Sequence, residues 1–297
     1  MKFLLDNPIL SKELRGRMRG WKGSALLVAY LMLLGFFVLS FYAAFAVEAN
    51  SSSNPGDTQT MGKIIFGTVV VSELLMVSFI APALTSGAFA SERERQTFDL
   101  LKISLLSDVD LVLGKLSAAL GYLLLLIFAA LPLEAIAFIL GGVGLAEFIV
   151  STLMLFVTAL FFCALGLLTS SFSKRVIVST VMSYAFNILS ALVFFIGIFL
   201  TAIFESLSVS ASQPNPLAEK FFSSLLWFLF STNSLFAAFA SESFLISEQN
   251  LWLVSGGGLF GSTNVTMLSP WIIYVVMYAL GSLLLLTLSV HFIRHVE

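Results

Sequence analysis

The sequence predicts an all-α membrane protein with six membrane-spanning helices, on three observations. The 297 residues are 59% hydrophobic and 11% charged, whereas about a quarter of a soluble domain is charged. Six apolar runs reach the length of about 20 residues that crosses a bilayer, and basic residues gather in alternate connections between them. Within one transmembrane domain over 1–297, we expect helices at 24–47, 64–90, 111–140, 148–170, 176–204 and 271–292.

Residues 1–22 are predicted to form an amphipathic helix in the plane of the membrane. Asn7 is a suitable N-cap, and Pro8 suits the first helical position. One face of this helix collects Leu10, Leu14, Met18 and Trp21, and the other collects Lys12, Arg15, Arg19 and Lys22. Such a helix lies on anionic lipid headgroups. A basic leader that only sets the topology is the alternative.

The basic residues predict the orientation. With a cytoplasmic N-terminus, the cytoplasmic face holds every Lys and Arg of the chain except Lys63 and Lys220. This is the bias toward positive charge on the inside. We therefore expect both termini in the cytoplasm.

Residues 205–270 then form a long outer segment that is apolar over 221–239. A seventh span there would carry Arg294 and His295 to the outer face and break the charge bias. We interpret 221–239 as re-entrant, or as lying at the outer interface, where irregular backbone must be shielded by protein or meet water. A true span, giving seven, remains the alternative.

The inner loop at 91–110 contains the most charged window of the chain. Phe98, Leu101 and Leu105 are spaced as one side of a short helix. Ser107, with Asp110 three residues on, resembles a capping box that begins the third span. A short surface helix between two spans can dock a soluble partner. A solvated loop with a helical kink is the alternative.

Two carboxylates, Glu73 and Glu134, lie inside predicted spans. A carboxylate at that depth is costly, so it faces a bundle interior, a cavity or a partner. The pair can mark a substrate pathway, or one of them can be a hydrogen-bonded carboxyl that joins two helices. Because no intramembrane Lys or Arg is expected beside them, the second interpretation is favoured. Pro82 and Pro132 are expected kink sites.

Several kinds of chemistry have no support in the sequence. It contains no Gly-Lys-Ser/Thr phosphate loop, no nucleophile elbow and no zinc-protease motif. Cys163 is the single cysteine, and both histidines, His291 and His295, are close to the C-terminus. We therefore expect no enzyme activity, no metal site and no nucleic-acid partner.

Several segments resemble the type-2 ATP-binding-cassette (ABC) exporter permeases. The first helix of that family is similar to Asn7-Pro8-Ile9-Leu10 and Lys12-Glu13-Leu14-Arg15. Its coupling segment is similar to Glu92-Arg93-Glu94-Arg95-Gln96-Thr97-Phe98-Asp99-Leu100-Leu101, followed by Gly114-Lys115. The opening of the last span, Ser269-Pro270-Trp271, and the basic tail at Arg294 also fit. Gln96 stands where many members carry Gly, and Phe98-Asp99 where many carry Leu-Glu.

The resemblance implies the permease subunit of an ATP-driven exporter in the bacterial cytoplasmic (inner) membrane. A second permease, identical or paralogous, would complete the pathway among membrane lipids, above separate cytoplasmic ABC ATPase subunits. ATP and Mg would act only through that ATPase, with no cofactor bound directly. The implied ATPase-coupling residues are Lys12, Glu13, Arg15, Glu92, Arg93, Glu94, Arg95, Thr97, Phe98 and Leu101. The alternatives are an ion- or proton-coupled carrier with Glu73 and Glu134 as its relay, and a membrane scaffold.

Overall fold

The computed structural model describes residues 21–49, 57–98, 107–140, 143–210, 216–238, 240–241, 252–255 and 266–295. In these ranges six helices are long and apolar enough to cross a membrane, which confirms the all-α class with six spans. They are α3 (Trp21–Ala49), α4 (Asp57–Thr85), α7 (Asp108–Leu140), α8 (Leu145–Phe172), α9 (Val176–Ser210) and α12 (Pro270–His295). The in-plane helix expected at 1–22 falls almost wholly outside the described residues.

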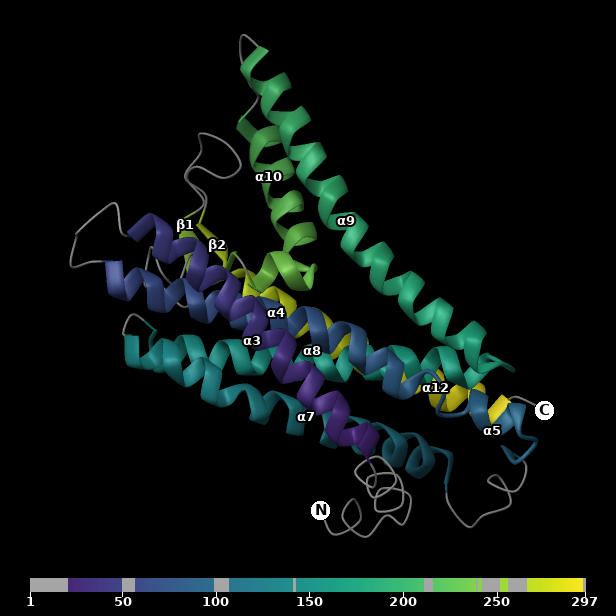
Figure 1. The fold of residues 1–297 in the computed structure, drawn as a ribbon. Helices are drawn as coiled ribbons and strands as arrows, with labels where there is room; N and C mark the ends of the chain where they lie inside the picture. Colours follow the sequence, from purple (N-terminus) through teal and green to yellow (C-terminus); the bar gives the residue numbers. More distant parts are fainter. Residues whose placement is uncertain are drawn as a thin grey trace.

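Helix α8 lies at the centre of the bundle. It contacts α4, α7, α9 and α12 (Figure 1). A Cβ atom at Gly166 would lie 2.0 Å from Thr85 Oγ1 and 3.2 Å from Ser86 N. Only a glycine lets the backbones of α4 and α8 approach this closely, as small residues commonly do between helices in membranes. The end of α4 is therefore seated directly on α8.

The outward faces of the bundle are apolar. Met32 on α3 is 72% exposed and Ile177 on α9 is 75% exposed. Phe36, Phe195 and Leu283 are likewise exposed on α3, α9 and α12. Such faces are costly in water, but they are the surfaces that helices present to lipid.

Pro82, an expected kink site, creates a polar contact between α4 and α9. Proline has no N–H, so the carbonyl of Ser78, four residues earlier, loses its helical partner. The side chain of Asn187 on α9 donates a hydrogen bond to that carbonyl at 2.7 Å. Tyr184 donates to the carbonyl of Phe79 at 3.0 Å, and its ring stacks on the Phe79 ring. The first half of α9 is fixed to α4 in this way.

The chain after α9 turns back toward the bundle. Helix α10 (Pro216–Ser231) returns beside α9 and reaches α12 (Figure 1). Strands β1 (Leu253–Ser255) and β2 (Thr266–Leu268) pair antiparallel before α12, and Trp227 Nε1 donates to the carbonyl of Leu268 at 2.9 Å. Helix α10 is not among the six candidate spans. A re-entrant path for 221–239 stays a prediction.

Candidate functional site

The charged residues of the inner loop form a short helix at one end of the bundle. Helix α5 (Ala90–Glu94) follows α4 after a turn at 86–89. We call residues 86–98 the α5 element. Glu92, Arg93 and Glu94 are therefore helical themselves, whereas the sequence indicated only a charged lead-in. The amphipathic helix expected from Phe98, Leu101 and Leu105 cannot be compared with the structure beyond Phe98, because residues 99–106 lie outside the described ranges.

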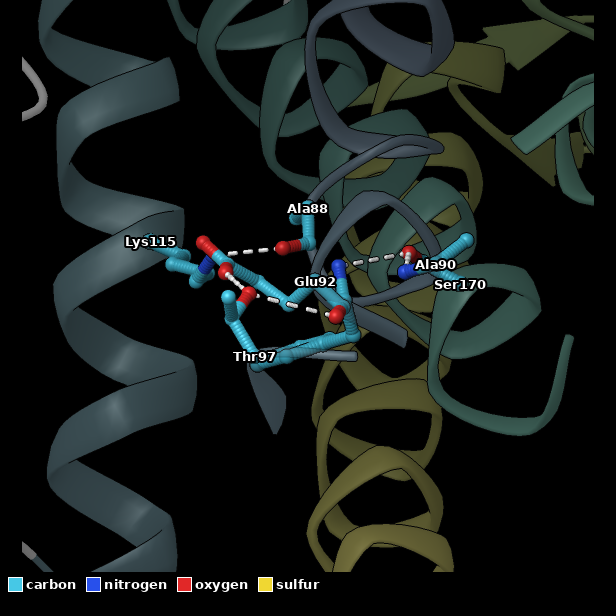
Figure 2. A network of polar contacts seen from close by, with 7 residues as sticks. Ala88, Ala90, Glu92, Thr97, Lys115 and Ser170 are labelled. Carbon is cyan, nitrogen blue, oxygen red and sulfur yellow. Dashed lines mark hydrogen bonds and ion pairs between the residues drawn. The ribbon is translucent and has the colours of Figure 1, made fainter. Parts of the chain in front are cut away.

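Helix α8 holds the start of the α5 element. Ser170 Oγ accepts hydrogen bonds from the backbone N–H groups of Phe89, at 2.8 Å, and of Ala90, at 2.9 Å (Figure 2). The first N–H groups of a helix have no partner within the helix. Here a side chain from another membrane helix satisfies them, so the position of α5 depends on that of α8.

Helix α7 holds the α5 element through Lys115. This side chain is 5% exposed and donates a hydrogen bond to the carbonyl of Ala88. Its Nζ lies 3.9 Å from a Glu92 carboxylate oxygen, and the other Glu92 oxygen accepts a 2.5 Å hydrogen bond from Thr97 Oγ1 (Figure 2). A buried ammonium group is tolerated only when it is paired and hydrogen-bonded. The α5 element supplies these partners.

Two further contacts reach the connection between α8 and α9. Arg93 donates to the carbonyl of Ser173 at 3.3 Å, and its guanidinium lies 4.7 Å from the centre of the buried Phe98 ring. A Glu94 oxygen accepts the N–H of Val176, the first residue of α9, at 3.4 Å, where a carboxylate also complements the helix dipole. The α5 element thus continues α4 and contacts α7, α8 and α9.

The α5 element ends in a tight turn at Gln96. Its φ of 58° is left-handed, which is rare for residues other than glycine. The turn lets the N–H of Thr97 bond the carbonyl of Glu92 at 2.9 Å. Glu94, Arg95 and Gln96 are exposed at this tip. Lys12, Glu13, Arg15 and Leu101, the other expected coupling residues, lie outside the described ranges.

A second polar cluster lies inside the bundle. Glu73 on α4 is 0% exposed, Glu134 on α7 is 2% exposed, and Tyr30 on α3 is 3% exposed. The three groups interact with one another electrostatically. Both oxygens of Glu73, one of Glu134 and the Tyr30 hydroxyl make no hydrogen bond of good geometry. The structure therefore brings together two carboxylates that the sequence could only place at depth.

Sequence reasoning missed three residues of these clusters. Lys115 was placed at the start of a span, with no indication that it is buried against the α5 element. Tyr30 is an isolated polar residue in an apolar run, and Ser170 is one of three consecutive hydroxyl residues, Thr169–Ser171, at the end of another. Such residues are too common in membrane helices to signal a role. Their partners are more than 20 residues away along the chain, so no local pattern could have found them.

The comparisons with known proteins agree with this architecture. A sequence model of the family described as "ABC-2 family transporter protein" matches residues 7–290. The match includes the α5 element and runs from before α3 into the last turns of α12. No curated protein matches the chain. The chain therefore belongs to the ABC-2 family of transporter proteins, as an integral membrane permease for which a separate ATPase is the kind of partner.

Proposed function

We propose that this permease is the transmembrane subunit of an ATP-driven exporter, and that the α5 element receives the force of a separate ATPase. The proposal is based on the contacts that the α5 element makes with the membrane helices. It is covalently continuous with α4 and bonded to α7 through Lys115, to α8 through Ser170, and to the start of α9 through Glu94. A partner that pushes the exposed tip moves the ends of four spans together.

The transmission of force follows from the kinds of contact involved. Buried hydrogen bonds and a paired lysine keep the α5 element in one position relative to α7 and α8. ATP-driven closure of two ATPase subunits would displace the α5 elements of two permeases. The spans of the two permeases would then close the pathway between them to the inner side of the membrane and open it to the outer side. The second permease is identical or paralogous.

The distribution of charge supports a cytoplasmic position for the α5 element. Most of the basic residues that the structure describes belong to the α5 element, the start of α7, the connection between α8 and α9 or the end of α12, namely Arg93, Arg95, Lys115, Lys174, Arg175 and Arg294. Figure 1 shows α5 close to the C-terminal end of α12. Lys63 lies on the first part of α4, toward the opposite end. Inner loops are enriched in Lys and Arg. On this proposal both termini are cytoplasmic and the membrane is the bacterial inner membrane.

The chemistry of ATP hydrolysis belongs to the partner on this proposal. The sequence has no phosphate loop of its own, so ATP and Mg²⁺ bind the ATPase subunit. Among the described residues, no group of three or more His, Cys, Asp or Glu side chains could hold a metal ion. The permease then contributes the pathway and the coupling surface, and catalyses no reaction.

Two variants of the α5 element test the proposal in a complex reconstituted with the ATPase. Phe98→Ala removes the ring beneath Arg93, and Glu94→Lys reverses a charge at the tip. We expect both to retain the helical fold and to lose the stimulation of ATP hydrolysis by the permease. Glu147→Lys, on the other end of α8, is the matched control. Full stimulation in both α5 variants would overturn the proposal.

A further inference from the structure

A long apolar groove lies between α3 and α4. Its volume is 890 Å³, within the range of about 300–1,000 Å³ that is typical of small-molecule sites. On α4 the lining extends from Lys63 to Ile80, which is about 26 Å at 1.5 Å per residue and close to the thickness of the hydrocarbon core. Leu33 and Phe79 line it and are 46% and 42% exposed. The groove therefore opens on the outer surface of the bundle, toward the lipid.

Gly67 makes the groove deeper at one end of α4. This residue lines the groove, and a Cβ atom added to it would meet no other atom within 4 Å. The missing side chain thus leaves open space, whereas the missing side chain of Gly166 lets two helices touch. Because lipid tails are as apolar as leucine, an acyl chain is suited to fill this space.

Lys63 lies at the end of the groove, at the boundary of the hydrocarbon core. Among the described residues that line the groove, Lys63 alone is charged. It is the second residue of the candidate span Gly62–Glu94. On α3, Phe41 also lines the groove, three residues before the end of the candidate span Gly23–Ala44. A lysine at this level extends its ammonium group toward the lipid headgroups.

The charge of Lys63 calls for an anion that the described part of the chain does not supply. Lys63 is half-buried and takes part in no ion pair among the described residues. Phospholipids place a phosphate group at this level of the membrane. In an anionic phospholipid no ammonium group of the headgroup offsets that phosphate, so the attraction to a nearby lysine is stronger than in a zwitterionic one. The hydroxyl group of Thr68 already bonds the carbonyl of Ile64.

We propose that the end of the groove at Lys63 binds one anionic phospholipid. Its phosphate lies at Lys63, and an acyl chain runs between α3 and α4 over Gly67. The acyl chains of one leaflet cover half of the hydrocarbon core, so this chain ends near the middle of the groove. The leaflet is the outer one if the α5 element is cytoplasmic, as proposed above. The binding itself is independent of that proposal, because it needs neither ATP nor the ATPase.

The charge requirement is tested with phosphatidylglycerol and phosphatidylcholine that carry the same photoreactive acyl chain. Each is added to the purified full-length chain in phosphatidylcholine nanodiscs, and mass spectrometry locates the labelled residues. Leu189 and Leu192, exposed on α9, report general contact with lipid. We expect the ratio of phosphatidylglycerol to phosphatidylcholine labelling to be about fivefold higher in the groove than on α9, the ratio that one basic residue near an anionic headgroup supplies.

Three variants assign that preference to one side chain. Lys63→Gln should lower the labelling ratio of the groove to that of α9, and the conservative Lys63→Arg should preserve it. Lys174→Gln, which removes an exposed positive charge between α8 and α9, should also preserve it. Unchanged labelling of α9 shows that each variant is folded. The same labelling ratio in the wild type and in Lys63→Gln overturns the proposal.

The shape of the groove is tested with two glycine replacements. Gly67→Leu fills the groove without a clash, and Gly35→Leu adds the same side chain on α3, where a Cβ atom likewise meets nothing within 4 Å but does not line the groove. We expect Gly67→Leu alone to reduce the labelling of the groove by phosphatidylglycerol, and equal labelling of the two variants contradicts the proposal. A groove that neither lipid labels, in a chain labelled on α9, would show that a second permease covers it and would also overturn the proposal.

Discussion

At the scale of single residues, Gln96 occupies a backbone position that favours glycine. Here the chain takes the left-handed conformation that glycine adopts without cost, with a φ of 58°. A non-glycine residue in this region costs about 1–2 kcal/mol. The hydrogen bond between Thr97 and Glu92 that this turn permits offsets part of that cost.

The conformation of Gln96 predicts an unusual stability effect. Gln96→Gly should raise the midpoint of thermal unfolding, by an amount equivalent to at most about 1 kcal/mol, because it relieves the strain of the left-handed turn. Arg95→Gly is the matched control, since the backbone of Arg95 is right-handed with a φ of −86°. That variant should lower the midpoint. Destabilisation by Gln96→Gly equal to that by Arg95→Gly would contradict the assigned turn.

Ser170 holds the start of α5 through two hydrogen bonds. Ser170→Ala leaves two backbone N–H groups without an acceptor, at a cost of about 1–3 kcal/mol for each buried group. We expect faster amide hydrogen exchange in a peptide covering residues 87–97. Ser171→Ala is the control, because Ser171 is equally buried but bonds only the carbonyl of Leu168 in its own helix. Equal exchange in the two variants would show that Ser170 does not hold α5.

The residue-scale features were predictable only in part. The depth of Glu73 and Glu134 follows from their places in apolar runs, but which way they face depends on how α4 and α7 are rotated, and the sequence does not show this. The cap at Ser107 was predictable because its partner is local. Ser107 Oγ accepts the N–H of Asp110 at 3.2 Å, and α7 begins directly after it.

At the scale of helices, the pairing of α4 with α9 depends on a proline. Pro82 leaves the Ser78 carbonyl without a helical donor, and Asn187 on α9 supplies one. An unsatisfied carbonyl is costly in the membrane, where water is excluded. The kink site in one helix therefore becomes an attachment point for another.

This origin of the contact predicts a specific rescue. Asn187→Leu should destabilise the protein by about 1 kcal/mol, the usual size of a hydrogen bond between membrane helices. Pro82→Ala in the same chain should recover most of the loss, because the added N–H bonds the Ser78 carbonyl within α4. Pro132→Ala, on α7, is the control and should recover nothing. A chain with Asn187→Leu that responds identically to both proline replacements would contradict this explanation.

The six spanning helices were predictable because the apolar runs are long and separated by polar residues. The helices extend past those runs: α4 begins at Asp57 and α9 continues to Ser210. A helix satisfies its own backbone in any solvent, so it does not have to end where hydrophobic residues end. The contacts between α8, α4 and α12 were not predictable, since close approach at single glycines such as Gly166 has no distinct sequence pattern.

At the scale of the whole molecule, two separate polar clusters share a set of helices. The α5 element gathers the ends of α4, α7, α8 and α9. The carboxylate cluster joins α3, α4 and α7 in the middle of the bundle. Helices α4 and α7 belong to both clusters. If an ATPase displaces the α5 element, as proposed, the displacement acts on the two helices that carry Glu73 and Glu134.

Site-specific crosslinking in the native membrane identifies the protein that touches the α5 element. A photoreactive amino acid replaces Arg95, at the exposed tip of the α5 element, or Glu147, at the other end of α8, and mass spectrometry identifies the crosslinked protein. We expect position 95 to capture an ATPase subunit with a phosphate loop and position 147 not to capture one. Capture of no ATPase at position 95, or equal capture at both positions, would contradict the claim that the α5 element is the surface on which an ATPase acts.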